Sequence, residues 1–172
     1  MRENIILTGF MGVGKTSLGK LLASKLGCAF IDLDEKIEHD TNMTIPQIFE
    51  QYGEKYFREL EKTAVRDVST RRNVVIATGG GTVKDEENLE LLKKCGVVIC
   101  LTTEPEEIFR RTERRGERPV LDGGGNERLE TIKRLLAERE KFYSRADFKI
   151  DTTEWSPLQI VNEICEKIKL QR

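Results

Sequence analysis

The sequence predicts a three-layer α/β/α fold built on a five-stranded parallel sheet. Short apolar runs alternate along the chain with longer segments whose apolar residues recur at helical spacing, and this alternation is typical of parallel sheets covered by helices. The first run leads into Gly9-Phe10-Met11-Gly12-Val13-Gly14-Lys15-Thr16, a glycine-rich loop that joins a strand to a helix. With 172 residues and no linker-like stretch, the chain is expected to form a single domain, 1–172.

The predicted strands are short, mostly apolar runs that suit a buried sheet. They are residues 4–8, 28–31, 73–77, 97–101 and 148–150.

The predicted helices follow these runs. Residues 17–26 place leucines on one face before Gly27, which is a typical residue after a helix. Capping boxes predict helix starts at Thr44, Thr103 and Ser156, and Gly53 is expected to break the helix that starts at Thr44. The other predicted helices cover residues 86–94 and 127–143.

Composition excludes several classes of protein. A net charge of −1 argues against a general nucleic-acid binder, which would be basic. No apolar run reaches the length of a membrane span, and the amino terminus has no signal-peptide pattern. The cysteines are scattered without metal-type spacing, so we expect buried free thiols and a cytoplasmic protein.

The glycine-rich loop has the residue types that phosphate binding requires. Glycines let backbone N–H groups approach phosphate oxygens, and the following helix points its positive end at the same anion. Lys15 supplies a mobile positive charge, and Thr16 supplies a hydroxyl for Mg²⁺. The alternative, a glycine-rich turn that binds nothing, is the weaker interpretation.

Two further groups of residues follow predicted strands directly. Asp32 and Asp34 come after the second strand, where period two sends both side chains the same way, and residues 78–81 place three glycines after the third strand. Asp32 or Asp34 could instead cap the next helix. Because ligands bind at the carboxyl ends of parallel strands, these residues and the phosphate loop are expected to form one site.

Several arginines are candidates for anion binding. Arg58 and Glu61 are spaced to touch on a helix, although a surface ion pair has the same spacing. Arg139 falls on an apolar stripe, where it needs an anionic partner or must extend to solvent. Residues 112–125 are rich in arginine and glycine, which fits either a phosphate-covering lid or a solvated loop.

Taken together, the motifs resemble those of the shikimate kinase family, within the nucleoside-monophosphate-kinase-like group of P-loop proteins. The resemblance covers essentially the whole chain. It is carried by the phosphate loop, Asp32-x-Asp34, Phe57-Arg58-x-x-Glu61, Thr78-Gly79-Gly80-Gly81, Arg118-Pro119-x-Leu121, Arg139-x-x-x-Tyr143, and Asp151-Thr152 with Pro157 downstream.

For the nucleotide, the resemblance implies ATP and Mg²⁺ as cofactors. The backbone from Gly12 through Val13, Gly14, Lys15 and Thr16 to Ser17 would wrap the phosphates, with Thr16 on the metal and Asp32 holding it through water. Arg111, Trp155 and Pro157 would flank the adenine, and Arg118 would come from the lid to the transferring phosphate.

For the acceptor, the resemblance implies phosphorylation of the 3-hydroxyl of shikimate. Arg58 and Arg139 would bind its carboxylate, with Glu61 orienting Arg58; Asp34, Gly80 and Gly81 would complete the site. Asp34 would orient the hydroxyl and is a candidate proton acceptor. Lys15, Asp34 and Arg118 are thus the expected catalytic residues, residues 33–61 the substrate-binding helical segment, and the protein a monomer.

Two alternatives remain at this point. One is a kinase of the same fold that acts on another hydroxylated acid such as gluconate, or on a nucleoside monophosphate. The other is a non-catalytic nucleotide-binding module; the N-K-x-D motif expected of a GTPase is not present in the sequence.

Overall fold

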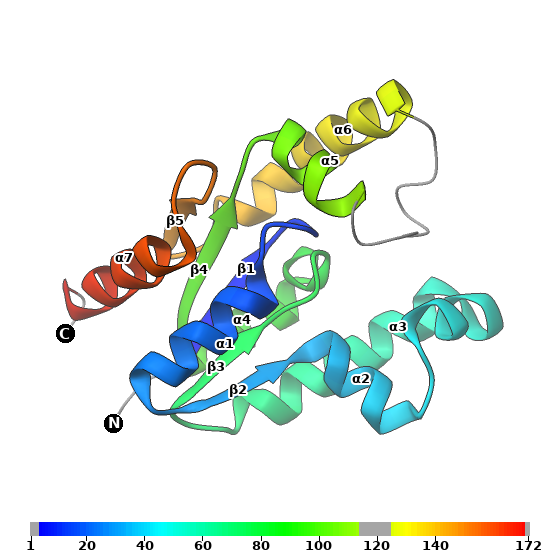
Figure 1. The fold of residues 1–172 in the computed structure, drawn as a ribbon. Helices are drawn as coiled ribbons and strands as arrows, with labels where there is room; N and C mark the ends of the chain where they lie inside the picture. Colours follow the sequence, from blue (N-terminus) through cyan, green and yellow to red (C-terminus); the bar gives the residue numbers. More distant parts are fainter. Residues whose placement is uncertain (1–3, 114–124, 171–172) are drawn as a thin grey trace.

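The computed structural model describes residues 4–113 and 125–170 (Figure 1). Its centre is a five-stranded sheet in the order β2-β3-β1-β4-β5, in which every neighbouring pair is parallel. The predicted fold class is therefore confirmed. The strands are β1 (Asn4–Gly9), β2 (Ala29–Asp32), β3 (Val74–Ala77), β4 (Gly96–Thr102) and β5 (Phe148–Asp151).

Helices cover both faces of the sheet, with α1 on one face and α4 on the other (Figure 1). Helix α7 packs against α1, whereas α3 packs against α4. The described helices are α1 (Lys15–Leu26), α2 (Leu33–Thr41), α3 (Ile45–Ser69), the short 3₁₀ helix η1 (Thr82–Lys84), α4 (Glu86–Cys95), α5 (Pro105–Glu113), α6 (Gly125–Tyr143) and α7 (Pro157–Leu170).

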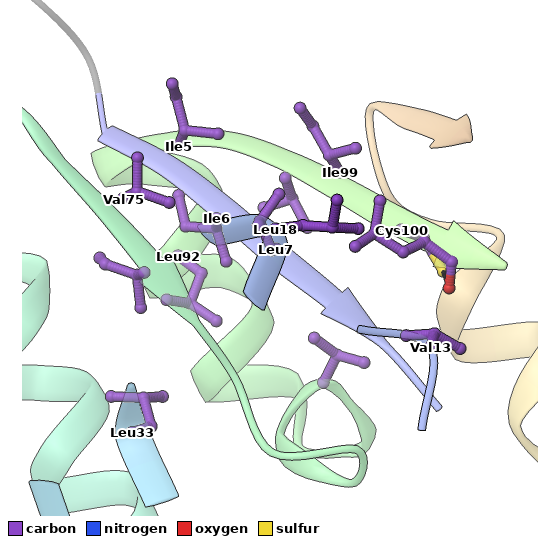
Figure 2. Packing of buried hydrophobic residues seen from close by; sticks show 14 of the residues in the cluster. Ile5, Ile6, Leu7, Val13, Leu18, Leu33, Val75, Leu92, Ile99 and Cys100 are labelled. Carbon is purple, nitrogen blue, oxygen red and sulfur yellow. Dashed lines mark hydrogen bonds between the residues drawn. The ribbon is translucent and has the colours of Figure 1, made fainter. Parts of the chain in front are cut away.

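The core lies on both faces of the central strands. Every residue of β1 is buried, and Ile6, Leu7 and Val75 are completely enclosed (Figure 2). Apolar side chains therefore point to both sides of these strands, which explains why they appear in the sequence as continuous apolar runs. No helix in the part of the chain that the structure describes is long and apolar enough to cross a membrane.

The strand register brings the predicted site residues to one edge of the sheet. Ala77 is opposite both Leu7 of β1 and Asp32 of β2. The phosphate loop, Asp32 and the glycines after β3 therefore start at the same level of the sheet. Their convergence was predicted from the parallel arrangement alone and is confirmed.

Local signals explain most helix boundaries. Thr44 and Gln47 form a complete capping box, and Gly53 (φ 78°, ψ 173°) leaves helical geometry and divides α3. The capping box predicted at Thr103 is wrong. Helix α5 begins at Pro105, and the Thr103 hydroxyl instead pairs with that of Thr153 at 3.2 Å between the two oxygens.

Candidate phosphate-transfer site

The phosphate loop has the backbone geometry that its glycines allow. Gly12 and Gly14 have φ values of 82° and 100°, which lie in the left-handed region that favours glycine. The loop ends at the amino terminus of α1, where the backbone N–H groups of the first turn and the helix dipole favour an anion. Lys15 Nζ donates to the carbonyls of Gly9 at 2.8 Å and Phe10 at 2.9 Å, so the ammonium lies over the loop.

Asp32 uses its two carboxylate oxygens for two purposes. Oδ1 accepts from the backbone N–H groups of Asp34 and Glu35 and so caps α2. Oδ2 accepts from Thr16 Oγ1 at 2.6 Å. The predicted alternative of a helix cap is therefore confirmed, and the same carboxylate also contacts the phosphate loop through Thr16.

The pair Thr16 and Asp32 fits a magnesium ion. Mg²⁺ prefers oxygen ligands and usually takes one or two protein groups together with phosphate oxygens and water. Within residues 4–113 and 125–170, no group of three or more His, Cys, Asp or Glu side chains could hold a metal by itself. A hydroxyl and a carboxylate beside the phosphate loop match the chemistry that a nucleotide-bound ion needs.

The period-two argument for Asp32 and Asp34 is wrong, although its conclusion holds. The strand ends at Asp32, and Asp34 belongs to the first turn of α2. Both residues nevertheless line the same cavity, because the helix begins immediately at the sheet edge.

This cavity has a volume of about 430 Å³ and lies beside the phosphate loop. Its lining combines carboxylates from β2, α2 and α3 with two guanidinium groups from α3 and α6. These groups suit a ligand that carries both a carboxylate and hydroxyl groups. The lining residues include Thr16, Asp32, Asp34, Glu35, Glu38, Phe49, Phe57, Arg58, Glu61, Gly79, Gly80, Gly81 and Arg139.

Arg58 is held by carboxylates on its own helix. Its Nη1 donates to Glu61 Oε2 at 2.8 Å, and its Nη2 donates to Glu54 Oε1 at 3.0 Å. Burial opposes the charge of the guanidinium, but Glu61 and then Glu54 outweigh it and raise the pKa of Arg58 above its usual value. The pair with Glu61 is not a surface ion pair, because only 2% of Glu61 is exposed.

Arg139 approaches the cavity from α6. It is buried, its guanidinium carbon lies 4.9 Å from the centre of the Phe10 ring, and Nη1 lies 3.4 Å from the carbonyl oxygen of Gly80. Among the described residues no carboxylate forms an ion pair with it. A buried guanidinium in this setting is suited to an anionic ligand.

The glycines after β3 bring both arginines close to the backbone. A Cβ atom at Gly80 would lie 3.1 Å from Arg139 Nη1, and one at Gly81 would lie 2.9 Å from Arg58 Nη1. The two guanidinium groups therefore flank one short loop, as the predicted acceptor site requires.

The residues predicted to flank the adenine do not line the cavity described above. Arg111 Nη1 donates to the Val13 carbonyl at 3.4 Å, while its Nε donates to Glu107, so Arg111 contacts the phosphate loop. Ser17 is exposed at the start of α1. Trp155 is exposed and lines a separate cavity of about 450 Å³ with Lys149 of β5. Pro157 begins α7.

Arg118 and residues 114–124 of the expected lid lie outside the described residues, so those predictions are untested by the structure.

Sequence reasoning missed several residues that support the site. Phe10 stacks on Arg139, Glu107 holds Arg111, and Thr82 donates to Glu61 Oε1 at 2.6 Å. Tyr143 was noted only as part of a motif, but its hydroxyl donates to the Gly80 carbonyl at 2.7 Å. Only the helical spacings of Glu107 with Arg111 and of Arg139 with Tyr143 were visible in the sequence as a signal.

Comparisons with known proteins agree with this geometry. The family model described as Shikimate kinase matches residues 11–169. A shikimate kinase of Thermoanaerobacter pseudethanolicus is 46% identical over 166 residues, which cover 96% of this chain and 94% of the relative. A solved shikimate kinase of Acinetobacter baumannii in complex with shikimate has a TM-score of 0.93 and 36% identity, covering 100% of this chain and 96% of the other. That of Bacteroides thetaiotaomicron has a TM-score of 0.90 and 35% identity, covering 97% and 98%.

Proposed function

This chain belongs to the shikimate kinase family, and we propose that it transfers the γ-phosphoryl group of ATP to the 3-hydroxyl of shikimate. The observation that supports this most strongly is the position of Arg58 and Arg139. Arg58, Arg139 and Asp34 line one cavity, which is also lined by Thr16 of the phosphate loop. A carboxylic acid bound by the arginines would have its hydroxyl groups near the terminal phosphate.

On the nucleotide side, we assign the phosphates to the loop from Gly12 to Ser17. The backbone N–H groups and the amino terminus of α1 would bind the phosphate oxygens, and Lys15 would place its charge on the outer ones. Thr16 and, through water, Asp32 would hold Mg²⁺, which when bound neutralises charge on the phosphates. Arg111, Trp155 and Pro157 remain proposed neighbours of the adenine, and Arg118 of the lid a proposed contact of the transferring phosphate.

On the acceptor side, Arg58 and Arg139 would bind the carboxylate of shikimate. Asp34 would orient the acceptor hydroxyl and is the candidate acceptor of its proton. The hydroxyl oxygen forms a bond to the γ-phosphorus while the bond to the bridging oxygen of ADP breaks. Positioning and charge neutralisation supply most of the rate in such a transfer, so Lys15, Asp34 and Arg118 are the proposed catalytic residues.

A coupled assay of ADP formation tests this function. We expect turnover with shikimate and at least about 100-fold lower kcat/KM with gluconate, because gluconate cannot present a cyclic array of hydroxyls to Asp34 while two arginines bind its carboxylate. The variant Asp34→Asn should lose turnover while binding ATP normally. Comparable rates with gluconate, or full activity of Asp34→Asn, would overturn the assignment.

We further propose that the protein acts as a monomer in the cytoplasm, without a nucleic-acid or membrane partner. The formal net charge of −1 supports the part of this proposal that concerns nucleic acid. Residues 33–61 would form the acceptor-binding segment of one kinase domain, and residues 112–125 its lid. Sedimentation velocity with and without shikimate would measure the oligomeric state.

A further inference from the structure

The carbonyl of Gly80 accepts two hydrogen bonds from helix α6. Tyr143 donates its hydroxyl at 2.7 Å, and Arg139 donates Nη1 at 3.4 Å. The two donors lie one helical turn apart and therefore share a face of α6. Gly80 is also close to the phosphate loop, since a Cβ there would lie 3.5 Å from the backbone nitrogen of Met11.

This carbonyl controls the direction of a neighbouring N–H group. The carbonyl of Gly80 and the N–H of Gly81 belong to one planar trans peptide, so they point in opposite directions. Glycine on both sides leaves the peptide unusually free to rotate. A bond that directs the carbonyl toward α6 consequently turns the Gly81 N–H away from α6, and Gly81 lines the acceptor cavity beside Arg58.

Tyr143 is suited to hold this peptide in one orientation. The side chain is 3% exposed, and burial raises the pKa of Tyr143 to about 12, so its hydroxyl remains a donor at neutral pH. Its bond to Gly80 is much shorter than that of Arg139, whose contact at 3.4 Å is weak. The phenol thus satisfies the Gly80 carbonyl and lies beside the Arg139 guanidinium, which needs no strong bond to that carbonyl and can bind a ligand.

We propose that Tyr143 is a positioning residue for the acceptor acid, which holds the Gly80 carbonyl so that the Gly81 N–H and the Arg139 guanidinium both remain directed to the bound acid. Tyr143 is not among the described residues that line the cavity, so it acts through its neighbours Gly80 and Arg139. The inference rests on the proposed function, because the acid is taken to be shikimate.

The test is Tyr143→Phe, which keeps the buried ring and removes only the hydroxyl. We expect the Kd of shikimate, measured by calorimetry without nucleotide, to rise about 5-fold to 10-fold, as the loss of one buried hydrogen bond predicts. The KM for shikimate should rise equally, while kcat and the KM for ATP stay within about 2-fold. Ser69→Ala is the matched control, because it removes a hydroxyl that donates to the Arg66 carbonyl at 2.8 Å at the far end of α3.

The outcomes are distinct. Shikimate binding that is unchanged in Tyr143→Phe, with only a lower melting temperature, would mean that the hydroxyl is merely structural and would overturn the inference. An equal rise in the KM values of both substrates would overturn it too. A wild-type protein that does not bind shikimate would instead remove the proposed function on which the inference rests.

Discussion

Glu61 lies almost wholly inside the protein, yet its Oε2 accepts a hydrogen bond from Arg58 Nη1 at 2.8 Å. Its other oxygen accepts from Thr82 Oγ1 at 2.6 Å. One buried carboxylate therefore links helix α3, which carries Arg58, to the segment that follows the glycine loop. Because Glu61 is buried and Glu54 is exposed, we expect the position of the Arg58 guanidinium to depend on this link more than on Glu54.

The variant Glu61→Gln tests this relationship. The amide has the same shape but cannot neutralise the guanidinium, and a hydrogen bond to a charged group contributes about 1.5–3 kcal/mol. We expect the KM for shikimate to rise about 10-fold to 100-fold with little change in the KM for ATP. Glu54→Gln is the control, since Glu54 is 63% exposed and should change the KM less than about 2-fold. Equal effects of the two variants would contradict the account.

Gly81→Ala tests how closely the glycine loop approaches Arg58. A Cβ atom would lie 2.9 Å from Nη1 and 3.0 Å from Nη2, so the guanidinium would have to move away from its ligand position. Steady-state kinetics should show a higher KM for shikimate at an unchanged KM for ATP. Gly27→Ala is the control: its φ of 64° strains alanine, but no atom lies within 4 Å, so it should cost about 1 kcal/mol of stability and leave both KM values alone.

Two substitutions of Asp32 separate its roles. Asparagine caps helices about as well as aspartate, so Asp32→Asn should keep the melting temperature and raise the Mg²⁺ concentration needed for half-maximal activity. Asp32→Ala should also lose about 1 kcal/mol of stability, because α2 loses its cap. Thermal denaturation and a Mg²⁺ titration of the rate measure the two effects. A Mg²⁺ requirement that is unchanged in both variants would exclude Asp32 from the metal site.

Stability at alkaline pH should depend on Cys100. Burial raises the pKa of this thiol to about 12, whereas a thiol in the unfolded chain has a pKa of about 8.5. A group whose pKa is raised by folding makes its full contribution to the stability of the folded state below its unfolded pKa. That contribution is lost as the pH rises toward the pKa in the folded state. Between pH 7 and pH 10, ionisation of Cys100 in the unfolded chain should therefore lower the free energy of unfolding by about 2 kcal/mol.

Urea unfolding of the wild type and of Cys100→Ala at both pH values measures this loss. The alanine variant should lose about 2 kcal/mol less between pH 7 and pH 10 than the wild type. Equal losses in the two proteins would show that the thiol does not ionise differently on unfolding.

Much of the site was predictable because strand ends converge in a parallel sheet. The phosphate loop, Asp32 and the glycines after β3 are each local signals, and the sheet topology brings them together without any information on side chains. The cap at Asp32 was also predictable, because capping depends on neighbouring residues.

The remaining features depend on contacts between distant segments. The stacking of Arg139 on Phe10 and the bond from Thr82 to Glu61 join elements whose spacing in the sequence carries no signal. The pairing of Thr103 with Thr153 overrode a local capping pattern for the same reason. The argument from strand periodicity failed at Asp34 because β2 ends two residues earlier, which the pattern of apolar residues does not reveal.

The central claim is that Arg58 and Arg139 bind the carboxylate of an acid whose hydroxyl lies near the terminal phosphate of ATP. A crystal structure with shikimate and a non-hydrolysable ATP analogue tests this most directly. The account predicts the carboxylate between the two guanidinium groups, with the 3-hydroxyl between Asp34 and the γ-phosphate. Shikimate bound outside this cavity, or with its carboxylate turned toward Asp34, would contradict it.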